Sequence, residues 1–237
     1  MTSAQDIPVY QKEYYFPAPA KLGRMYGVLT EEITLPMLEE AYWHGYFPWP
    51  DNSSDAIPWA HPHERGMIFL PEDFHIPHTV KRLIKKGIFE LRIDTVFEQV
   101  IRHCALRNNG EDTWITDTII ENYIRFHQAG WAHSFESWNK ETGELAGGLY
   151  GISIGGVFAG ESMFFRESGA SKFALAHLGM ILQHCGGRLM DTQMVTPTTE
   201  LFGAKLYSRQ HYLESLERLR SRPLTTEEFQ TAAAMLQ

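Results

Sequence analysis

Three apolar segments that follow one another between residues 131 and 165 constrain the fold of this chain more than any other feature. A polar turn over 139–143 separates the segments 131–138 and 144–154, and the pair Gly155-Gly156 separates the second segment from 157–165. A Gly-Gly pair between two apolar runs signals a tight hairpin, because glycine tolerates the positive φ that such turns need. The pattern therefore predicts three consecutive strands in an antiparallel meander.

Helix and strand signals on both sides of the meander complete the pattern. Residues 171–185 are predicted to be a helix because Ala174, Leu178, Ile181 and Cys185 form one apolar stripe. Before the meander, Thr34 and Gly45 have the residue types that begin and end a helix. The other expected helices cover 79–86, 96–107, 117–130, 208–219 and a segment from 225, and the other expected strands cover 67–70, 89–93 and 188–195. Residues 47–62 are expected to form a loop rich in Pro and Trp.

The order of meander, helix, strand and helix is that of the acyl-CoA N-acyltransferase (GNAT) fold. We therefore expect an α+β chain with a central, mostly antiparallel sheet flanked by helices. The length of 237 residues suits one large domain or a main domain with a small lobe.

Composition excludes several classes of protein. A net charge of −8 argues against a protein that coats nucleic acid electrostatically. The chain has two cysteines without CxxC spacing, which fits a reducing cytosol. Residues 1–15 lack the apolar core of a signal peptide, and no run of about 18 apolar residues predicts a membrane span. We expect a cytoplasmic protein that does not bind membranes.

One local basic patch stands out in this acidic chain. Lys81, Arg82, Lys85 and Lys86 would lie along one stripe of a helix. Such a stripe can hold a few phosphates of a nucleic acid. The alternative, which the sequence leaves open, is an ordinary solvated helix face.

Asp191 and Gln193 are the most informative polar residues, because they interrupt an otherwise apolar predicted strand. Residues two apart share a face, about 7 Å from each other along the strand. An acidic group beside an amide can accept a hydrogen bond from an amine nucleophile and aim it at a carbonyl carbon. The alternative is a buried polar pair that is satisfied by backbone groups.

Glu161 is a second carboxylate in the middle of an apolar predicted strand. An unpaired buried carboxylate is costly, so it needs a partner. The partner can be a cation such as Arg166 or Lys172 in a structural ion pair, or an amine-bearing substrate.

Aromatic residues gather in the predicted loop and near residue 114. Phe47, Trp49, Trp59 and Trp114 could stack on an unpaired base, worth about 1–3 kcal/mol for each base. The alternative is that they cover the hydrophobic core.

The GxSxG match at Gly151, Ser153 and Gly155 lies inside a hairpin and not in the strand–turn–helix that a hydrolase needs. The histidines show no zinc-ligand spacing, and we expect no metal site.

Together these residues resemble one family, the bacterial leucyl/phenylalanyl-tRNA–protein transferases, over about residues 24–219. Its motifs match Gly45-Tyr46-Phe47-Pro48-Trp49, Trp59…Pro62…Arg65, Thr113-Trp114-Ile115-Thr116, Ala132-His133-Ser134-Phe135-Glu136-Ser137-Trp138, Gly147-Gly148-Leu149-Tyr150-Gly151, Gly160-Glu161-Ser162-Met163-Phe164, Ala170-Ser171-Lys172, Asp191-Thr192-Gln193 and Gly203-Ala204. The resemblance implies a small N-terminal lobe, set at 1–65, on a GNAT-like catalytic domain, set at 66–237.

The resemblance also implies an activity. It implies transfer of Leu or Phe from aminoacyl-tRNA to proteins that begin with Lys or Arg, which creates a degradation signal of the N-degron pathway. No cofactor is implied because the ester is already activated, and we expect a monomer. The implied site roles are catalysis for Asp191 and Gln193, an aminoacyl pocket at Leu149, Glu161 and Leu178, adenosine binding at Phe47, Trp49 and Trp114, and tRNA phosphate binding at Lys81, Arg82, Lys85 and Lys86.

The chain departs from the family pattern at several positions. Thr192 replaces the usual Cys, the segment 198–202 lacks the usual His and Ser and carries Glu200, and Leu149 and Leu178 replace Met and Phe. These changes leave two alternatives open, an altered donor or acceptor, or a non-catalytic binder of tRNA ends or N-terminal residues. An acetyl-CoA-dependent N-acetyltransferase is a further alternative. The residues Arg166, Gly169 and Ala170 match the pyrophosphate-binding loop of such enzymes only weakly, and this argues against it.

Overall fold

The computed structural model describes residues 16–22, 27–50, 56–106 and 113–236. The expectation that residues 1–15 contain no signal peptide concerns a part of the chain outside these ranges. The elements are η1 (Pro19–Lys21), β1 (Gly27–Thr30), α1 (Leu35–His44), β2 (Phe47–Pro48), β3 (Ile57–Ala60), β4 (Glu64–Phe69), α2 (His78–Lys86), β5 (Phe89–Ile93), α3 (Phe97–Ala105), α4 (Asp117–Gln128), β6 (Ala132–Asn139), β7 (Leu145–Ile154), β8 (Val157–Phe165), α5 (Ala170–His184), β9 (Leu189–Gln193), α6 (Pro197–Glu200), β10 (Lys205–Ser208), α7 (Arg209–Leu219) and α8 (Thr226–Ala234).

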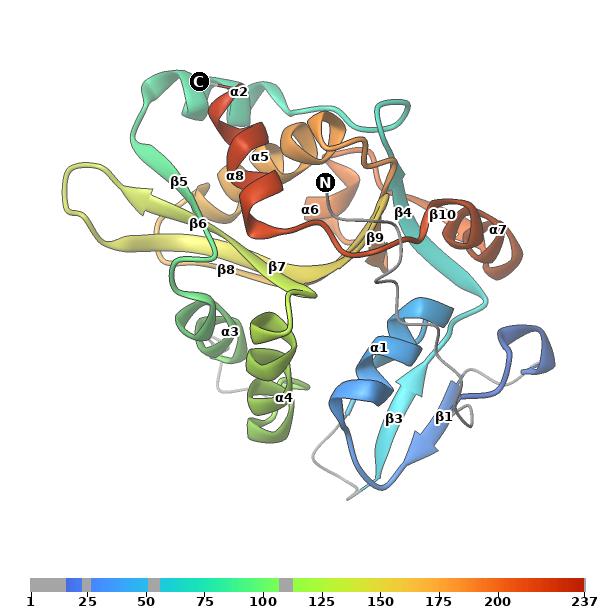
Figure 1. The fold of residues 1–237 in the computed structure, drawn as a ribbon. Coiled ribbons are helices and arrows are strands. Elements are labelled where there is room, and N and C mark those ends of the chain that lie inside the picture. The colour runs from blue at the N-terminus through green and yellow to red at the C-terminus, as the bar shows by residue number, and fades with distance from the viewer. Residues whose placement is uncertain (1–15, 23–26, 51–55, 107–112, 237) are drawn as a thin grey trace, which may run out of the picture.

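The N-terminal part holds a small sheet that the sequence did not reveal. β1, β3 and β2 form a three-stranded sheet in that order, and α1 precedes β2 along the chain. Figure 1 shows β1 and β3 side by side, next to α1. The expected loop over 47–62 is therefore wrong in part, because β2 and β3 lie within it. These strands are too short and too rich in Pro and Trp to show an alternating pattern. The helix signals hold: the Thr34 side chain accepts from the Met37 N–H, and Gly45 ends α1 with a φ of 84°.

The larger sheet confirms the predicted meander and the α+β class. Its seven strands have the order β10-β4-β9-β8-β7-β6-β5, and only the β8–β9 pair is parallel. β6, β7 and β8 are the three expected strands, and Gly155 makes the second turn with a φ of 65°. β4 crosses the expected lobe boundary between residues 65 and 66 and belongs to this sheet.

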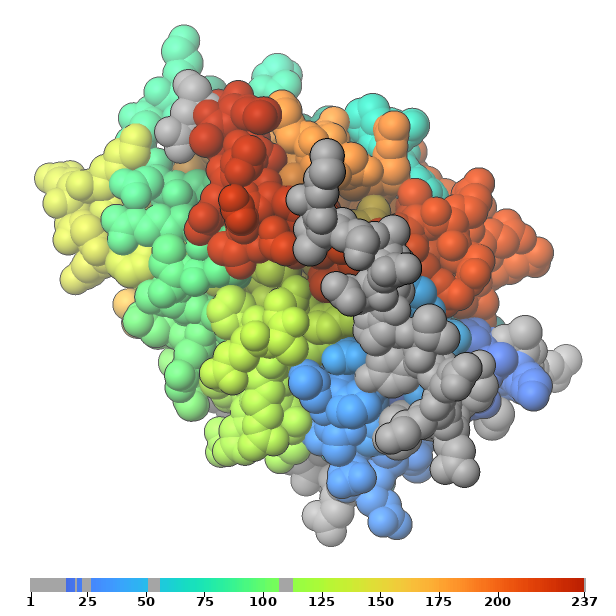
Figure 2. Space-filling model, viewed as in Figure 1, coloured from blue at the N-terminus to red at the C-terminus, as the bar shows by residue number. Residues whose placement is uncertain are grey.

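Helices cover both faces of the seven-stranded sheet, as expected (Figure 1). α5, α8 and α2 lie on one face, over a core cluster that includes Phe135, Leu149, Phe158, Leu178 and Met190. α3 and α4 lie on the other face, over a second cluster. That second cluster continues into the N-terminal lobe, which packs against α4 (Figure 2). No helix in the described ranges is long and apolar enough to cross a membrane.

Candidate active site

The parallel strands β8 and β9 separate at the centre of the sheet, and this separation creates the site. They pair only at Val157/Leu189, Phe158/Met190 and Ala159/Asp191. Beyond this point a β-bulge interrupts β8: Tyr150 pairs with Ser162 and Gly151 with Gly160, which leaves Glu161 without a partner on β7. Bulges re-aim side chains and are common beside active sites. The Gln193 Nε2 donates to Glu161 Oε1 at 3.0 Å, so a side-chain hydrogen bond joins the two strands where their backbones part.

Asp191 is completely buried and held from two directions. Its Oδ1 accepts from Arg65 Nε at 2.8 Å and its Oδ2 from Arg65 Nη2 at 2.6 Å. The backbone N–H of Gln193 also donates to Oδ1, at 2.9 Å. Gln193 has a φ of 53°, so the alternation of faces expected along β9 stops there. Asp191 and Gln193 therefore meet through the Gln193 backbone N–H and not side chain to side chain: the Gln193 amide bonds Glu161, and Asp191 forms a buried ion pair with Arg65.

Arg65 is the residue of this candidate site to which the sequence analysis gave no role. It lies on β4, is 1% exposed, and packs between the rings of Phe47 and Tyr212 at 4.5 and 4.4 Å from their centroids. Its Nη1 donates to the Gly45 carbonyl at 3.1 Å. Burial acts to lower the pKa of Arg65, but the Asp191 carboxylate raises it above its ordinary value. The only sequence signal was its place in the family motif after Trp59.

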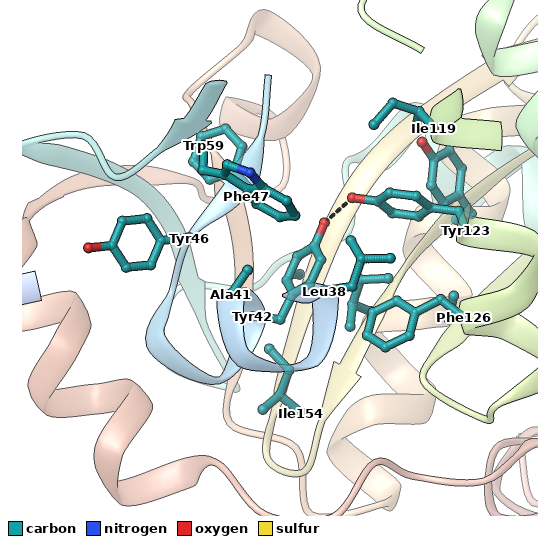
Figure 3. Close-up of a cluster of buried hydrophobic side chains, with 14 of the residues drawn as sticks. Leu38, Ala41, Tyr42, Tyr46, Phe47, Trp59, Ile119, Tyr123, Phe126 and Ile154 are labelled. Atoms are coloured by element: carbon teal, nitrogen blue, oxygen red, sulfur yellow. Dashed lines mark hydrogen bonds between the residues drawn. The ribbon is translucent and has the colours of Figure 1, made fainter. Parts of the chain in front are cut away.

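Glu161 is partly exposed, and its pKa departs strongly from the ordinary value of a carboxyl group. Burial raises the pKa of Glu161 to about 8, the Tyr42 hydrogen bond opposes that rise, and the Asp191 charge adds to it. Tyr42 comes from α1 and shares a hydrogen bond with the Tyr123 hydroxyl of α4 (Figure 3). The expected cations do not pair with Glu161: Arg166 contacts His103, and no ion pair of Lys172 occurs within the described ranges.

The predicted aromatic residues divide into an accessible pair and two core residues. Trp49 and Trp114 stack with centroids 5.8 Å apart and planes 10° apart, and Trp49 is 40% exposed. Phe47 is buried and meets Trp49 edge to face at 5.9 Å. Trp59 is fully buried and its Nε1 donates to Thr30 Oγ1, so it has the core role that was the alternative. Phe47 contacts both Trp49 and the Arg65 guanidinium, so it connects the tryptophan stack to the Arg65–Asp191 ion pair.

The three residues predicted to line an aminoacyl pocket do not form one group in the structure. Leu149 and Leu178 are 3% and 2% exposed and share the core cluster under α5. Glu161 instead contacts Tyr42, which belongs to the cluster on the other face. In this structure the two leucines offer little surface to a ligand. Within the described residues, no three His, Cys, Asp or Glu side chains gather as a metal ion would need.

The basic stripe occurs on α2 as expected. Lys81, Arg82, Lys85 and Lys86 are all exposed, and none of them has an ion pair among the residues that the structure describes. Val80 of the same helix packs into the cluster under α5, whereas Trp114 packs against the other cluster. The stripe and the tryptophan stack therefore lie on opposite sides of the sheet.

Comparison with known proteins gives a consistent result. The family model described as leucyl/phenylalanyl-tRNA protein transferase matches residues 68–217. Proteins named leucyl/phenylalanyl-tRNA–protein transferase include one from Oleidesulfovibrio alaskensis, 41% identical over 81% of this chain and 79% of that protein. The Chlorobaculum tepidum protein of that name is 44% identical over 75% of this chain and 91% of its own length. The Magnetococcus marinus protein is 39% identical over 97% of this chain and its whole length.

Solved structures show only distant similarity. L-PGS from Bacillus licheniformis gives a TM-score of 0.39 at 11% identity, covering 83% of this chain and 65% of that one. A GCN5-related N-acetyltransferase from Sphaerobacter thermophilus gives 0.37 at 15% identity, covering 77% and 58%. Scores this low place no constraint on what this chain does.

Proposed function

The chain belongs to the leucyl/phenylalanyl-tRNA–protein transferase family and has that aminoacyltransferase activity, and from this premise we propose the substrates and the roles of the site residues. The donor is tRNA charged with Leu or Phe, with Met as a further donor to be tested. The acceptor is the α-amine of a protein that begins with Lys or Arg. The product carries a new N-terminal residue that marks it for degradation, and the reaction takes place in the cytoplasm.

The charge of the buried cluster is the observation that carries the acceptor proposal. Glu161 and Asp191 supply two carboxylates, and Arg65 supplies one cation that is bound to Asp191. Burial favours the neutral form of Glu161 in the free site, and a bound cation favours its ionised form. When Glu161 is ionised, the cluster carries one net negative charge, at this partly exposed member. A site of this sign attracts an acceptor with a positive N-terminal side chain and repels one with an acidic side chain.

Two features support the proposed donor. Trp49 is stacked on Trp114 and remains 40% exposed, so an adenine ring can extend the stack. Stacking on aromatic side chains is how proteins hold unpaired bases such as the end of a tRNA. The exposed cations of α2 supply a local, sequence-independent attraction to phosphates in a chain whose net charge is −8. Because the aminoacyl ester is already activated, the proposed reaction needs no further cofactor.

Asp191 and Gln193 receive separate roles in this proposal. Asp191 is bound to Arg65, so it fixes the end of β9 and accepts the backbone N–H of Gln193. Gln193 then presents its side-chain amide to Glu161 and to the incoming amine. Holding the amine and the ester in an attacking geometry can remove a large part of the activation barrier of a two-substrate reaction. The buried leucines Leu149 and Leu178 would have to move apart for the aminoacyl side chain to enter between them.

Transfer of labelled amino acid from charged tRNA to a panel of peptides tests the proposal. The donors are Leu-, Phe-, Met- and Asp-tRNA, and the peptides differ only in the first residue, which is Arg, Lys, Ala or Glu. Transfer of Leu and Phe to the Arg and Lys peptides is the expected result. Preference for another donor or acceptor would assign the altered segment 198–202 and the two leucines a role in specificity. Tight tRNA binding without transfer to any peptide would support a binding protein instead.

A further inference from the structure

Aminolysis needs a proton acceptor, because the α-amine of a protein is largely an ammonium ion near pH 7, with a pKa of about 7.7–8.0. Asp191 is poorly suited to that task. Both of its oxygens face the Arg65 guanidinium, and Oδ1 also accepts from Gln193, so three donors occupy the carboxylate. It is also completely buried, whereas the acceptor amine must approach from solvent.

Glu161 has the opposite properties. It is partly exposed, it carries the unpaired position of the β8 bulge, and it lies where β8 and β9 separate. Gln193 holds one of its oxygens and Tyr42 donates to the carboxylate, but no cation forms an ion pair with it among the described residues. A carboxylate that is oriented by neutral donors and open to solvent on one side can bind an ammonium group and take its proton.

We propose that Glu161, and not Asp191, takes the proton from the acceptor's α-ammonium group, and that Tyr42 is the positioning residue that holds the Glu161 carboxylate for this step. The inference rests on the proposed function and deepens it. Tyr42 is 1% exposed, and its hydroxyl is fixed in turn by Tyr123 on α4 (Figure 3). The N-terminal lobe and α4 thereby set the position of the base on β8.

Each proton and each bond of the proposed step can be accounted for. One proton passes from the ammonium nitrogen to Glu161, which leaves a neutral amine. The nitrogen attacks the ester carbonyl carbon, the C–N bond forms, and the C–O bond to the terminal ribose of the tRNA breaks. The second nitrogen proton ends on the ribose oxygen, which leaves as a hydroxyl group. Glu161 releases its proton to water before the next cycle.

The surroundings of Glu161 match its basicity to this substrate. Burial raises the pKa of Glu161 to about 8, close to that of an α-ammonium group, so proton transfer between them is nearly balanced. Arg65 and the donors Tyr42 and Gln193 oppose the rise, and Asp191 adds to it. The titratable and charged groups that face this part of the site are Tyr42 on α1, Arg65 on β4, Cys104 on α3, Tyr123 on α4, Tyr150 on β7, Asp191 on β9 and Tyr212 on α7.

The pH dependence of kcat/KM for an Arg-initiated peptide tests the proposal. If Glu161 takes the proton, the reacting pair is a Glu161 carboxylate with an ammonium ion, so kcat/KM should follow a bell with its maximum near pH 8. Without an enzymatic base only the neutral amine reacts, and kcat/KM rises with pH to a plateau. Glu161→Gln should therefore lower kcat/KM at pH 8 by about 10²- to 10⁴-fold and convert the bell into that rise. A bell that survives in Glu161→Gln would overturn the proposal.

Tyr42→Phe and Tyr150→Phe are a matched pair for the role of Tyr42. Each removes one buried phenol oxygen near Glu161, but the Tyr150 hydroxyl has no hydrogen-bond partner among the described residues. Loss of the Tyr42 donor should move the ascending limb to higher pH, because that hydrogen bond lowers the pKa of Glu161. Tyr150→Phe should leave the limb in place. Equal profiles for the two variants would overturn the role of Tyr42.

A direct titration of the Glu161 carboxyl group distinguishes a proton acceptor from a residue with only a structural role. The carbon-13 signal of the Glu161 side-chain carboxyl, assigned by its loss in Glu161→Gln, should titrate near pH 8 in the wild type and at higher pH in Tyr42→Phe. Titration below pH 6 in the wild type would refute the proposed base. If the wild type transferred nothing to any peptide, the proposed function itself would fail. If it transferred Leu with a pH profile that Glu161→Gln does not change, only the present inference would fail.

Discussion

Removing the Arg65 guanidinium should destabilise the protein strongly, and removing Asp191 as well should cost less than the sum of the two single losses. Arg65→Met leaves the Asp191 carboxylate buried with only the Gln193 N–H as a donor. Asp191→Asn leaves the guanidinium buried without its counter-ion. Breaking a buried ion pair from one side costs about 3–5 kcal/mol, because the remaining charge stays desolvated. A protein of this kind has about 5–15 kcal/mol of stability, so either change removes a large part of it.

The double variant distinguishes the pair from two unrelated buried residues. Arg65→Met with Asp191→Asn leaves no unpaired charge, so it should cost less than the sum of the single changes by about 2–3 kcal/mol. In thermal unfolding, each single variant should melt roughly 6–20 °C below the wild type, at about 2–4 °C per kcal/mol for a chain of this size. Transfer activity should stay low in the double variant, because the end of β9 is no longer held.

Urea unfolding followed by circular dichroism measures the four free energies, with equal m-values as the condition for comparing them. The exposed pair Arg102–Glu98 is the control: its side chains are 52% and 56% exposed, and a coupling of only about 0.3–0.5 kcal/mol is expected. Additive losses at Arg65 and Asp191 would refute the reasoning. A loss below about 1 kcal/mol in Arg65→Met would refute it too, because the pair would then contribute no more than one at the surface.

Three further predictions concern the surroundings of the site. Trp49→Ala and Trp114→Ala should each weaken binding of aminoacyl-tRNA by about 1–3 kcal/mol in a filter-binding titration, and wild-type affinity in both would contradict the stacking role. Lys81→Glu with Lys85→Glu should weaken tRNA binding and reduce the slope of log K against log salt by about 0.9 for each phosphate that is no longer neutralised; an unchanged slope would show that α2 does not touch the RNA. Gly66→Ala should cost about 1–3 kcal/mol by overpacking and abolish most transfer, since its new Cβ would lie 2.5 Å from a backbone carbon just beyond β9; full activity and stability would contradict that close approach.

Much of the fold could be predicted because its signals are local. The Gly155 turn, the Thr34 cap and the Gly45 stop act within a few residues, and the structure uses all three. The small sheet of the N-terminal lobe could not be predicted in the same way. β2 and β3 are held by pairing with strands elsewhere in the lobe and carry no alternating pattern of their own.

The candidate site was predictable in its residue types but not in its connections. Two carboxylates and an amide in apolar strands were recognisable because such groups are costly to bury without a partner. Which partner each one takes depends on residues far away in the chain. The structure joins Asp191 to Arg65 across 126 positions, and Glu161 to Gln193 across 32.

The sequence by itself therefore determined the α+β class, the meander, the family and the presence of Asp191, Gln193 and Glu161, since hydrophobic period, turn residues and motifs are written along the chain. Only the tertiary structure decided that Arg65 neutralises Asp191, that Glu161 sits on a bulge under Tyr42, and that Trp49 stacks on Trp114. The physical reason is that charge pairing, desolvation and stacking depend on distances in space. Those distances are set when the two core clusters pack against opposite faces of the seven-stranded sheet.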